Sequence, residues 1–290
     1  MNPTTVTIAA DVPCQLAENP LWDAPKQCVY WTDIPAGKLY SLDVTTGRHR
    51  MIYEGEPVGG FTLQENGDLL LFRQNDISLL NGQGIVSKLR AFTDNGMKRF
   101  NDVIADPRGR VFAGTIGEHP KGGLYRVDLD GAVTKLFSGT GCSNGMGFSP
   151  DAKKFYWTCS TTRHIFQFDF DAESGAITNR SVFYATTPDE GIPDGLTVDV
   201  EGCVWSARWA GASVVRHAPD GSVLTRLRLP AENITSLCFG GTSLEDVFVT
   251  SAQSEEANPT PVPGLFRMGV GIRGVPEFRS RINLPATSAS

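Results

Sequence analysis

Short apolar runs separated by turn residues fill most of the chain, and this pattern predicts β-strands. One set of runs is rich in β-branched and aromatic residues and is bounded by Gly, Pro, Asn or Asp: CVYWTDI, GDLLLF, GRVFAGTI, KKFYWTC, GCVWSAR and DVFVTSA. A second set alternates apolar and polar residues and ends in a Gly turn, as hairpin strands do: GKLYSLDVTTG, GGLYRVDLDG, HIFQFDFDAESG and SVVRHAPDG. Long segments with helical periodicity are absent from the sequence, so the pattern predicts an all-β protein.

The strand pattern also repeats along the chain. Copies begin near Asn19, Gly60, Asn101, Asn144, Asp194 and Ile234. Their spacing of roughly 40 to 50 residues is the period of propeller blades with about four strands. We therefore expect residues 1–290 to form a single six-bladed β-propeller domain, with four-stranded antiparallel blades around a central channel. Val6–Ala9 is expected to complete the last blade and close the ring. A stack of β-sandwiches is the alternative, which the near-equal spacing and the recurring strand-Trp motif disfavour.

Composition narrows the class of protein and of partner. The chain has 290 residues, of which 40% are hydrophobic and 20% charged, as in soluble globular proteins. A net charge of −6 disfavours binding to nucleic acid or to an anionic membrane. No apolar run is long enough to span a membrane, and the N-terminus lacks the features of a secretory signal. The six cysteines are scattered, which favours reduced thiols. We expect a cytoplasmic protein, either a monomer or a weak homo-oligomer.

The phase of the repeat indicates where chemistry could occur. The residue before the apolar part of each first strand is, in chain order, Glu18, Gly59, Asn101, Asn144, Asp194 and Ile234. Equivalent positions in a ring converge on its axis, so a Glu, an Asp and two Asn should face one another at the channel mouth. Taken singly, Asn144-Gly145 and Asp194-Gly195 are also ordinary turn dipeptides.

Two carboxylates that converge in a channel repel each other, and a divalent cation would neutralise them. Glu18, Asn144 and Asp194 offer only oxygen ligands, which suit Ca²⁺, Mg²⁺ or Mn²⁺. The set lacks the Cys and His ligands of a structural zinc site. The repeat therefore predicts one metal site at the mouth, held by these three residues.

Several segments resemble the SMP-30/gluconolactonase/regucalcin (SGL) family over nearly the whole chain. They are AENPLWD, RFNDVIADPRGRVFAGTI, SNGMGFSPDAKKFYW, IPDGLTVDVEGCVWSARW and TSLCFGGTSLEDVFVTSA. The resemblance implies a six-bladed propeller that hydrolyses sugar-acid lactones with one divalent metal ion. It maps the metal ligands onto Glu18, Asn144 and Asp194. Ca²⁺ is the expected ion, with Mg²⁺, Mn²⁺, Zn²⁺ and Fe²⁺ as alternatives.

The resemblance also maps substrate contacts onto Arg99 and Asn101. Vertebrate members have an acidic pair after the Gly-Thr motif, where this chain has Glu118-His119. We expect Glu118 or His119 to line the rim and to set specificity, which leaves the sugar and the ring size open. Asp194 is the expected general base, because as a ligand it would lie beside a water bound to the metal.

Three other functions are compatible with a propeller. A protein-binding platform without a metal has no use for converging carboxylates. A calcium-binding regulatory protein would bind the metal without lactone turnover. A propeller esterase or phosphotriesterase would be expected to carry a second, buried calcium site, for which the sequence shows no clear ligands.

Overall fold

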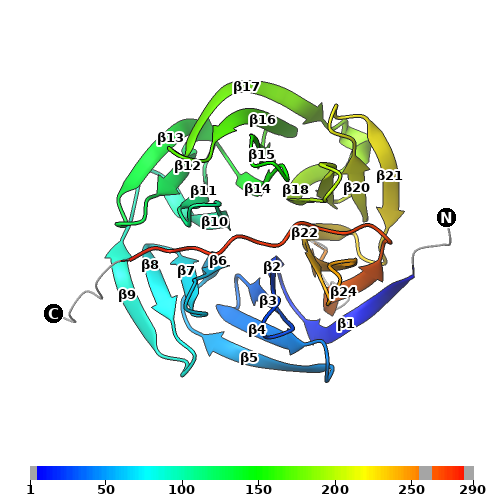
Figure 1. Ribbon diagram of the computed structural model, residues 1–290, viewed down its shortest axis with the longest axis horizontal. Helices are drawn as coiled ribbons and strands as arrows, with labels where there is room; N and C mark the ends of the chain where they lie inside the picture. The colour runs from blue at the N-terminus through cyan, green and yellow to red at the C-terminus, as the bar shows by residue number, and fades with distance from the viewer. Residues whose placement is uncertain (1–4, 255–262, 284–290) are drawn as a thin grey trace.

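The computed structural model describes residues 5–254 and 263–283, which form six four-stranded antiparallel sheets arranged in a ring (Figure 1). This confirms the predicted six-bladed β-propeller. Blades 1 to 5 are β2–β5, β6–β9, β10–β13, β14–β17 and β18–β21, and blade 6 consists of β22, β23, β24 and β1. We call the end of the ring axis where the inner strands begin the mouth, and the end where they finish the floor.

Strands at equivalent places in the blades have similar lengths. The inner strands are β2 (Ala17–Asp23), β6 (Val58–Leu63), β10 (Met97–Ala105), β14 (Ser143–Phe148), β18 (Ile192–Val198) and β22 (Asn233–Gly240). The second strands are β3 (Cys28–Asp33), β7 (Leu69–Arg73), β11 (Val111–Gly117), β15 (Lys154–Cys159), β19 (Val204–Trp209) and β23 (Asp246–Ala252). The third strands are β4 (Lys38–Asp43), β8 (Asp76–Leu80), β12 (Gly122–Val127), β16 (His164–Asp171), β20 (Ser213–His217) and β24 (Pro263–Gly269). The outer strands are β5 (Arg48–Glu54), β9 (Val86–Ala91), β13 (Val133–Thr140), β17 (Ala176–Ala185), β21 (Val223–Arg228) and β1 (Val6–Pro13).

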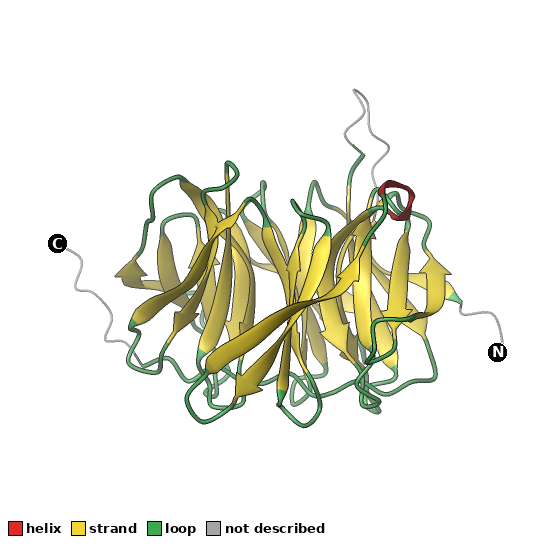
Figure 2. Cartoon of the chain, turned by 90° about the horizontal axis from the view of Figure 1, so that it is seen from above, coloured by secondary structure: helices red, strands yellow, loops and turns green. Residues whose placement is uncertain are grey.

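Helical structure in the described residues is limited to one short 3-10 helix, Pro188–Glu190, which lies among the loops on the upper side of the ring in Figure 2. Within the described ranges, no helix has the length and hydrophobicity to span a membrane.

The ring is closed by the first strand of the chain. β1 pairs antiparallel with β24, with Val6 opposite Met268 and Ile8 opposite Phe266. This confirms the closing strand predicted at Val6–Ala9, which the structure extends to Pro13. The edges of the first and last strands are thereby paired.

The recurring strand tryptophans form part of the core between blades. Trp31, Trp157 and Trp205 lie on the second strands of blades 1, 4 and 5, and all three are almost completely buried. Two of their indole N–H groups donate buried hydrogen bonds, Trp157 to Ser143 Oγ and Trp205 to Asp199 Oδ2. The second strands are therefore fixed against the inner strands, which carry the candidate site.

After β24 the chain crosses the floor of the ring as an extended segment, residues 270–283, drawn in red in Figure 1. We call it the floor segment. Gly274 N donates to Leu244 O in blade 6, Ser280 Oγ bonds with Thr62 Oγ1 in blade 2, and Asn283 N donates to Leu129 O in blade 3. The segment thus connects blades on opposite sides of the ring.

Candidate metal centre and substrate site

A β-bulge in every inner strand aims side chains at the ring axis. In β2 the pairing with β3 runs from Glu18↔Thr32 to Leu21↔Tyr30, so the inner strand has one extra residue. The same shift occurs in the other inner strands at the equivalent place. A bulge breaks the strict alternation of side chains and redirects them. The three predicted ligand positions, Glu18, Asn144 and Asp194, lie at or directly beside these bulges.

Glycines let the bulged strands approach one another closely. A Cβ atom on Gly145 would lie 2.3 Å from Leu196 N and 2.7 Å from Asp194 O, which no side chain tolerates. On Gly59, in blade 2, a Cβ would lie 1.9 Å from Phe100 O. Glycine is therefore required next to Asn144, where it brings β14 against β18 and so places two candidate ligands together.

The three candidate ligands are buried at the mouth. The exposed fractions of Glu18, Asn144 and Asp194 are 4%, 4% and 5%. Burial raises the pKa of the Glu18 carboxyl well above its ordinary value, and the charges of Asp194 and Asp102 raise it further. Burial and the charge of Asp102 likewise raise the pKa of Asp194, while the nearby Asn144 side chain opposes this effect. The carboxyl groups of Glu18 and Asp194 are therefore close enough to repel each other strongly when both are ionised.

Several buried oxygen atoms in this cluster have no hydrogen-bond donor among the described residues: Asn144 Oδ1, Asp194 Oδ1 and Asp102 Oδ1. A buried acceptor without a partner is costly, so such atoms require an explanation. Ligation of a hard cation provides one, because carboxylate and amide oxygens are its preferred ligands. Within the described chain, no group of three or more His, Cys, Asp or Glu side chains is arranged to hold a metal ion, so the candidate set depends on the amide oxygen of Asn144.

Arg99 and Asn101 form the neighbouring part of the site on β10. Arg99 Nη1 donates to Asn101 Oδ1 and, at 2.9 Å, to Phe100 O. Asn101 Nδ2 donates to Ser143 O at 3.0 Å. The remaining N–H groups of Arg99 have no protein partner in the described residues, and its side chain is half-buried. Arg99 thus presents free donors at the mouth.

Asp102 belongs to this cluster, although the phase of the repeat does not select it. It is buried, and burial raises the pKa of its carboxyl to about 7. The Arg99 guanidinium acts against this rise. If Glu18, Asp102 and Asp194 are ionised and Arg99 is protonated, the cluster has a net charge of −2, which one divalent cation balances. The only sequence signal for Asp102 is its position beside Asn101.

Glu118 and His119 lie in the turn between β11 and β12, where both are exposed. Glu118 pairs with Lys121 at 3.7 Å in this turn, and the described residues give it no hydrogen bond to the cluster. The His119 side chain lies beside Gly141, which precedes the inner strand β14. The structure therefore brings Glu18, Arg99, Asn101, Asn144 and Asp194 together and places Glu118 and His119 on a peripheral turn.

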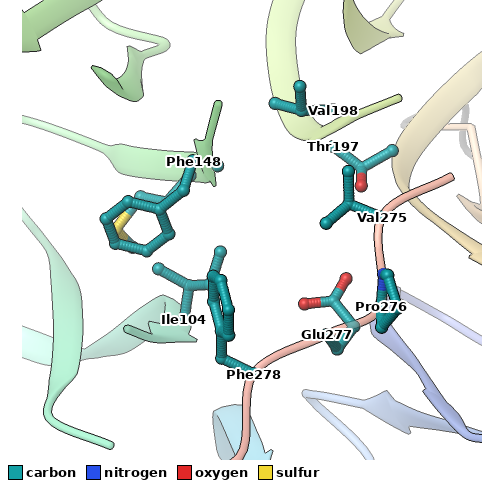
Figure 3. Close-up of a pocket in the computed structure, with 10 residues that line it drawn as sticks. Ile104, Phe148, Thr197, Val198, Val275, Pro276, Glu277 and Phe278 are labelled. Carbon is teal, nitrogen blue, oxygen red and sulfur yellow. The ribbon is translucent and has the colours of Figure 1, made fainter. Parts of the chain in front are cut away.

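The floor segment contributes one carboxyl group to the ring axis. Between the mouth and the floor, a small cavity of about 40 Å³ is lined by Asn19, Asp102, Ser236 and Glu277, among other residues. Figure 3 shows the adjoining pocket, where Glu277 of the floor segment turns its carboxyl inward between Pro276 and Phe278. Burial alone raises the pKa of Glu277 to about 7.

Comparison with known proteins gives a consistent result. Residues 16–253 match the family described as SMP-30/Gluconolactonase/LRE-like region. A pentonolactonase of Haloferax volcanii, XacC, is 39% identical over 97% of this chain and 99% of its own length. Human regucalcin is 32% identical over 91% of this chain and 94% of its own.

Solved structures have the same architecture. A calcium-binding protein, regucalcin, from Agrobacterium tumefaciens superposes with a TM-score of 0.91 at 26% identity, over 97% of this chain and 98% of that one. A gluconolactonase from Xanthomonas campestris superposes with a TM-score of 0.77 at 20% identity, over 92% and 89%, which shows the shared fold. The family match over most of the chain and the relatives above 30% identity lead to one conclusion: the chain belongs to the SMP-30/gluconolactonase family of lactonases.

Proposed function

We propose that the protein hydrolyses a sugar-acid lactone to the free acid, with a divalent metal ion held by Glu18, Asn144 and Asp194. The observation that carries the proposal is the group of buried oxygen atoms at the mouth, with Asn144 Oδ1 and Asp194 Oδ1 lacking donors in the described chain. Ca²⁺ is the proposed ion, because the ligands are all oxygen atoms. Mg²⁺, Mn²⁺, Zn²⁺ and Fe²⁺ are the alternatives to be tested.

When bound, such an ion polarises a lactone carbonyl and lowers the pKa of a bound water. Asp194 is then the proposed general base. Its carboxylate accepts a proton from the water whose oxygen bonds to the carbonyl carbon. As the bond from that carbon to the ring oxygen breaks, Asp194 returns the proton to the departing oxygen, which becomes a hydroxyl group.

Arg99 and Asn101 are proposed to orient the substrate. The unpaired N–H groups of Arg99 suit the hydroxyl and ring oxygens of a polyol. The bond from Arg99 to Asn101 fixes both side chains, so they do not have to be ordered when substrate binds. Glu118 and His119, on the exposed turn, are proposed to contact the parts of the sugar that lie farthest from the lactone carbonyl.

The substrate class is supported by the relatives, which include a pentonolactonase and a gluconolactonase. We propose aldonolactones such as glucono-, galactono-, xylono- or arabinolactone. The proposal is tested by stripping the protein with a chelator, adding back each metal singly, and following acid release from these lactones at fixed pH. Rates are compared with the spontaneous hydrolysis of each lactone. Full activity of the metal-free protein would overturn the proposal.

A second function is a calcium-binding role with little catalysis, which the regucalcin relatives favour. It predicts stoichiometric calcium binding and no lactone hydrolysis above background with any of the metals. The same add-back experiment separates the two functions, because it measures metal content and acid release on one sample.

A further inference from the structure

We propose that Ser160 is a positioning residue that sets the geometry of two of the three candidate metal ligands, Asn144 and Asp194. Ser160 is the first residue after β15 and lies outside the set of inner-strand positions. The inference rests on the proposed function, because it assumes that those two residues hold the ion.

The orientation of the Asn144 amide is set by the hydrogen bonds of its nitrogen. Asn144 Nδ2 has two hydrogens, and both have acceptors: Ser160 Oγ at 3.0 Å and Cys142 Sγ at 3.7 Å. The amide nitrogen is therefore held on the side of Ser160, and Oδ1 remains as the buried, unpaired atom. An amide rotated by 180° would present N–H donors to the ion, which repel a cation. The oxygen of Ser160 is the closer of the two acceptors and the better one.

Ser160 also contacts the backbone next to Asp194. The hydroxyl of Ser160 donates to the carbonyl oxygen of Pro193 at 2.7 Å. Pro193 precedes Asp194 directly, at the bulge where β18 leaves its regular pairing with β19. One hydroxyl thus accepts from one candidate ligand and donates to the backbone that carries another. It links β14 and β18 across the boundary between blades 4 and 5.

Ser160 is itself held rigidly. Its backbone N donates to Cys142 O at 3.1 Å, and its backbone carbonyl accepts from Arg163 N at 3.1 Å. The hydroxyl is thus fixed before any ion arrives. Residues that orient metal ligands in this way commonly contribute about 10- to 100-fold to metal affinity.

The test is a calorimetric titration of Ca²⁺ into chelator-stripped wild-type protein and into Ser160→Ala, Ser160→Thr and Thr162→Ala. We expect Ser160→Ala to weaken Ca²⁺ binding about tenfold or more. Ser160→Thr keeps the hydroxyl and should restore most of the affinity. Thr162→Ala is the matched control, because it removes from the same turn a hydroxyl whose only hydrogen bond within the described residues is to Cys159 O.

Thermal unfolding of the stripped proteins separates this role from a purely structural one. A positioning role leaves the melting temperature of metal-free Ser160→Ala near that of wild type, and it lowers only the shift that Ca²⁺ produces. Ser160→Ala that binds Ca²⁺ as tightly as wild type overturns the inference and leaves the proposed function intact. Wild-type protein that binds no Ca²⁺, Mg²⁺ or Mn²⁺ overturns both. If Ser160→Ala does not fold, the inference is tested with Ser160→Thr alone. A Ser160→Thr variant that is as stable as wild type but binds Ca²⁺ at least tenfold more weakly overturns the inference.

Discussion

Both ends of the ring axis contain inward-facing carboxyl groups, but their surroundings differ. At the mouth, burial raises the pKa values of Glu18, Asp102 and Asp194. The charge of Asp102 raises those of Glu18 and Asp194 further, and the charge of Arg99 lowers all three. At the floor, Glu277 has a raised pKa for one reason only, which is burial. A single buried carboxylate becomes neutral when it binds one proton, whereas a group of converging carboxylates carries more negative charge than one proton can neutralise. The mouth is thus suited to a divalent cation and the floor to a neutral acid.

The largest effect is expected from Asp194→Asn. The substitution keeps the shape of the side chain and removes both a ligand charge and the proposed base, so kcat should fall about 10³-fold. Initial rates of acid release at saturating metal measure the effect. If Asp194→Asn retains both metal affinity and rate, Asp194 is neither the ligand nor the base that we propose.

Removal of the metal should make stability more dependent on pH. In the metal-free protein the raised pKa of Asp102, about 7 against an ordinary 3.8, means that the folded state holds a proton that the unfolded chain has lost. Glu18 and Asp194 shift in the same direction. The stability of the metal-free protein should therefore fall as pH rises from 3.8 to about 7.

Saturating Ca²⁺ should remove the contribution of the mouth carboxyl groups to this fall, and at 100 times its Kd it should add about 2.7 kcal/mol. Melting temperatures at pH 5, 6, 7 and 8, with and without chelator, measure both effects. A metal-free protein that is equally stable across this range would contradict the electrostatics of the mouth.

Substitution of Gly145 should alter the candidate metal site by displacing the backbone of β18. In Gly145→Ala the new methyl group collides with the backbone of Asp194 and Leu196, so β18 must shift. We expect a loss of about 1–3 kcal/mol in stability, the typical cost of overpacking. Ca²⁺ affinity should fall as well. Gly82→Ala is the control, because a Cβ atom there meets nothing within 4 Å. Equal behaviour of the two variants would show that close approach at the bulge is unimportant.

The smallest effect is expected at the floor. Glu277 has a folded pKa of about 7 against 4.5, so its ionisation costs stability as pH rises between these values. Glu277→Gln removes that cost and should raise the melting temperature at pH 8 by about 2 °C or more. Little change is expected at pH 4.5, and none in Ca²⁺ affinity. A variant that loses Ca²⁺ binding would show that floor and mouth act as one site.

The sequence predicted the ring and the residues that the repeat places at equivalent positions. Glu18, Asn144 and Asp194 could be selected because one phase of a repeat converges on one axis. Asp102 could not, because simple alternation gives it the opposite side of the strand from Asn101, and only the bulge brings both into the site. Ser160 and Glu277 lie outside the inner strands, so their positions depend on how the turns and the floor segment pack. The exposure of Glu118 likewise follows from a turn whose course the sequence does not reveal.

The pairing of β1 with β24 has a consequence for how the protein folds. Within blades 1 to 5, neighbouring strands are also neighbours in the sequence, so each blade is built from local hairpins. Blade 6 joins Val6 to Met268, a contact between residues near opposite ends of the described chain. Such distant contacts form slowly, because a long loop must close before they contribute any stability. The last blade should therefore be completed late, and Glu18 and Asp194 should acquire their native separation only when the ring has closed.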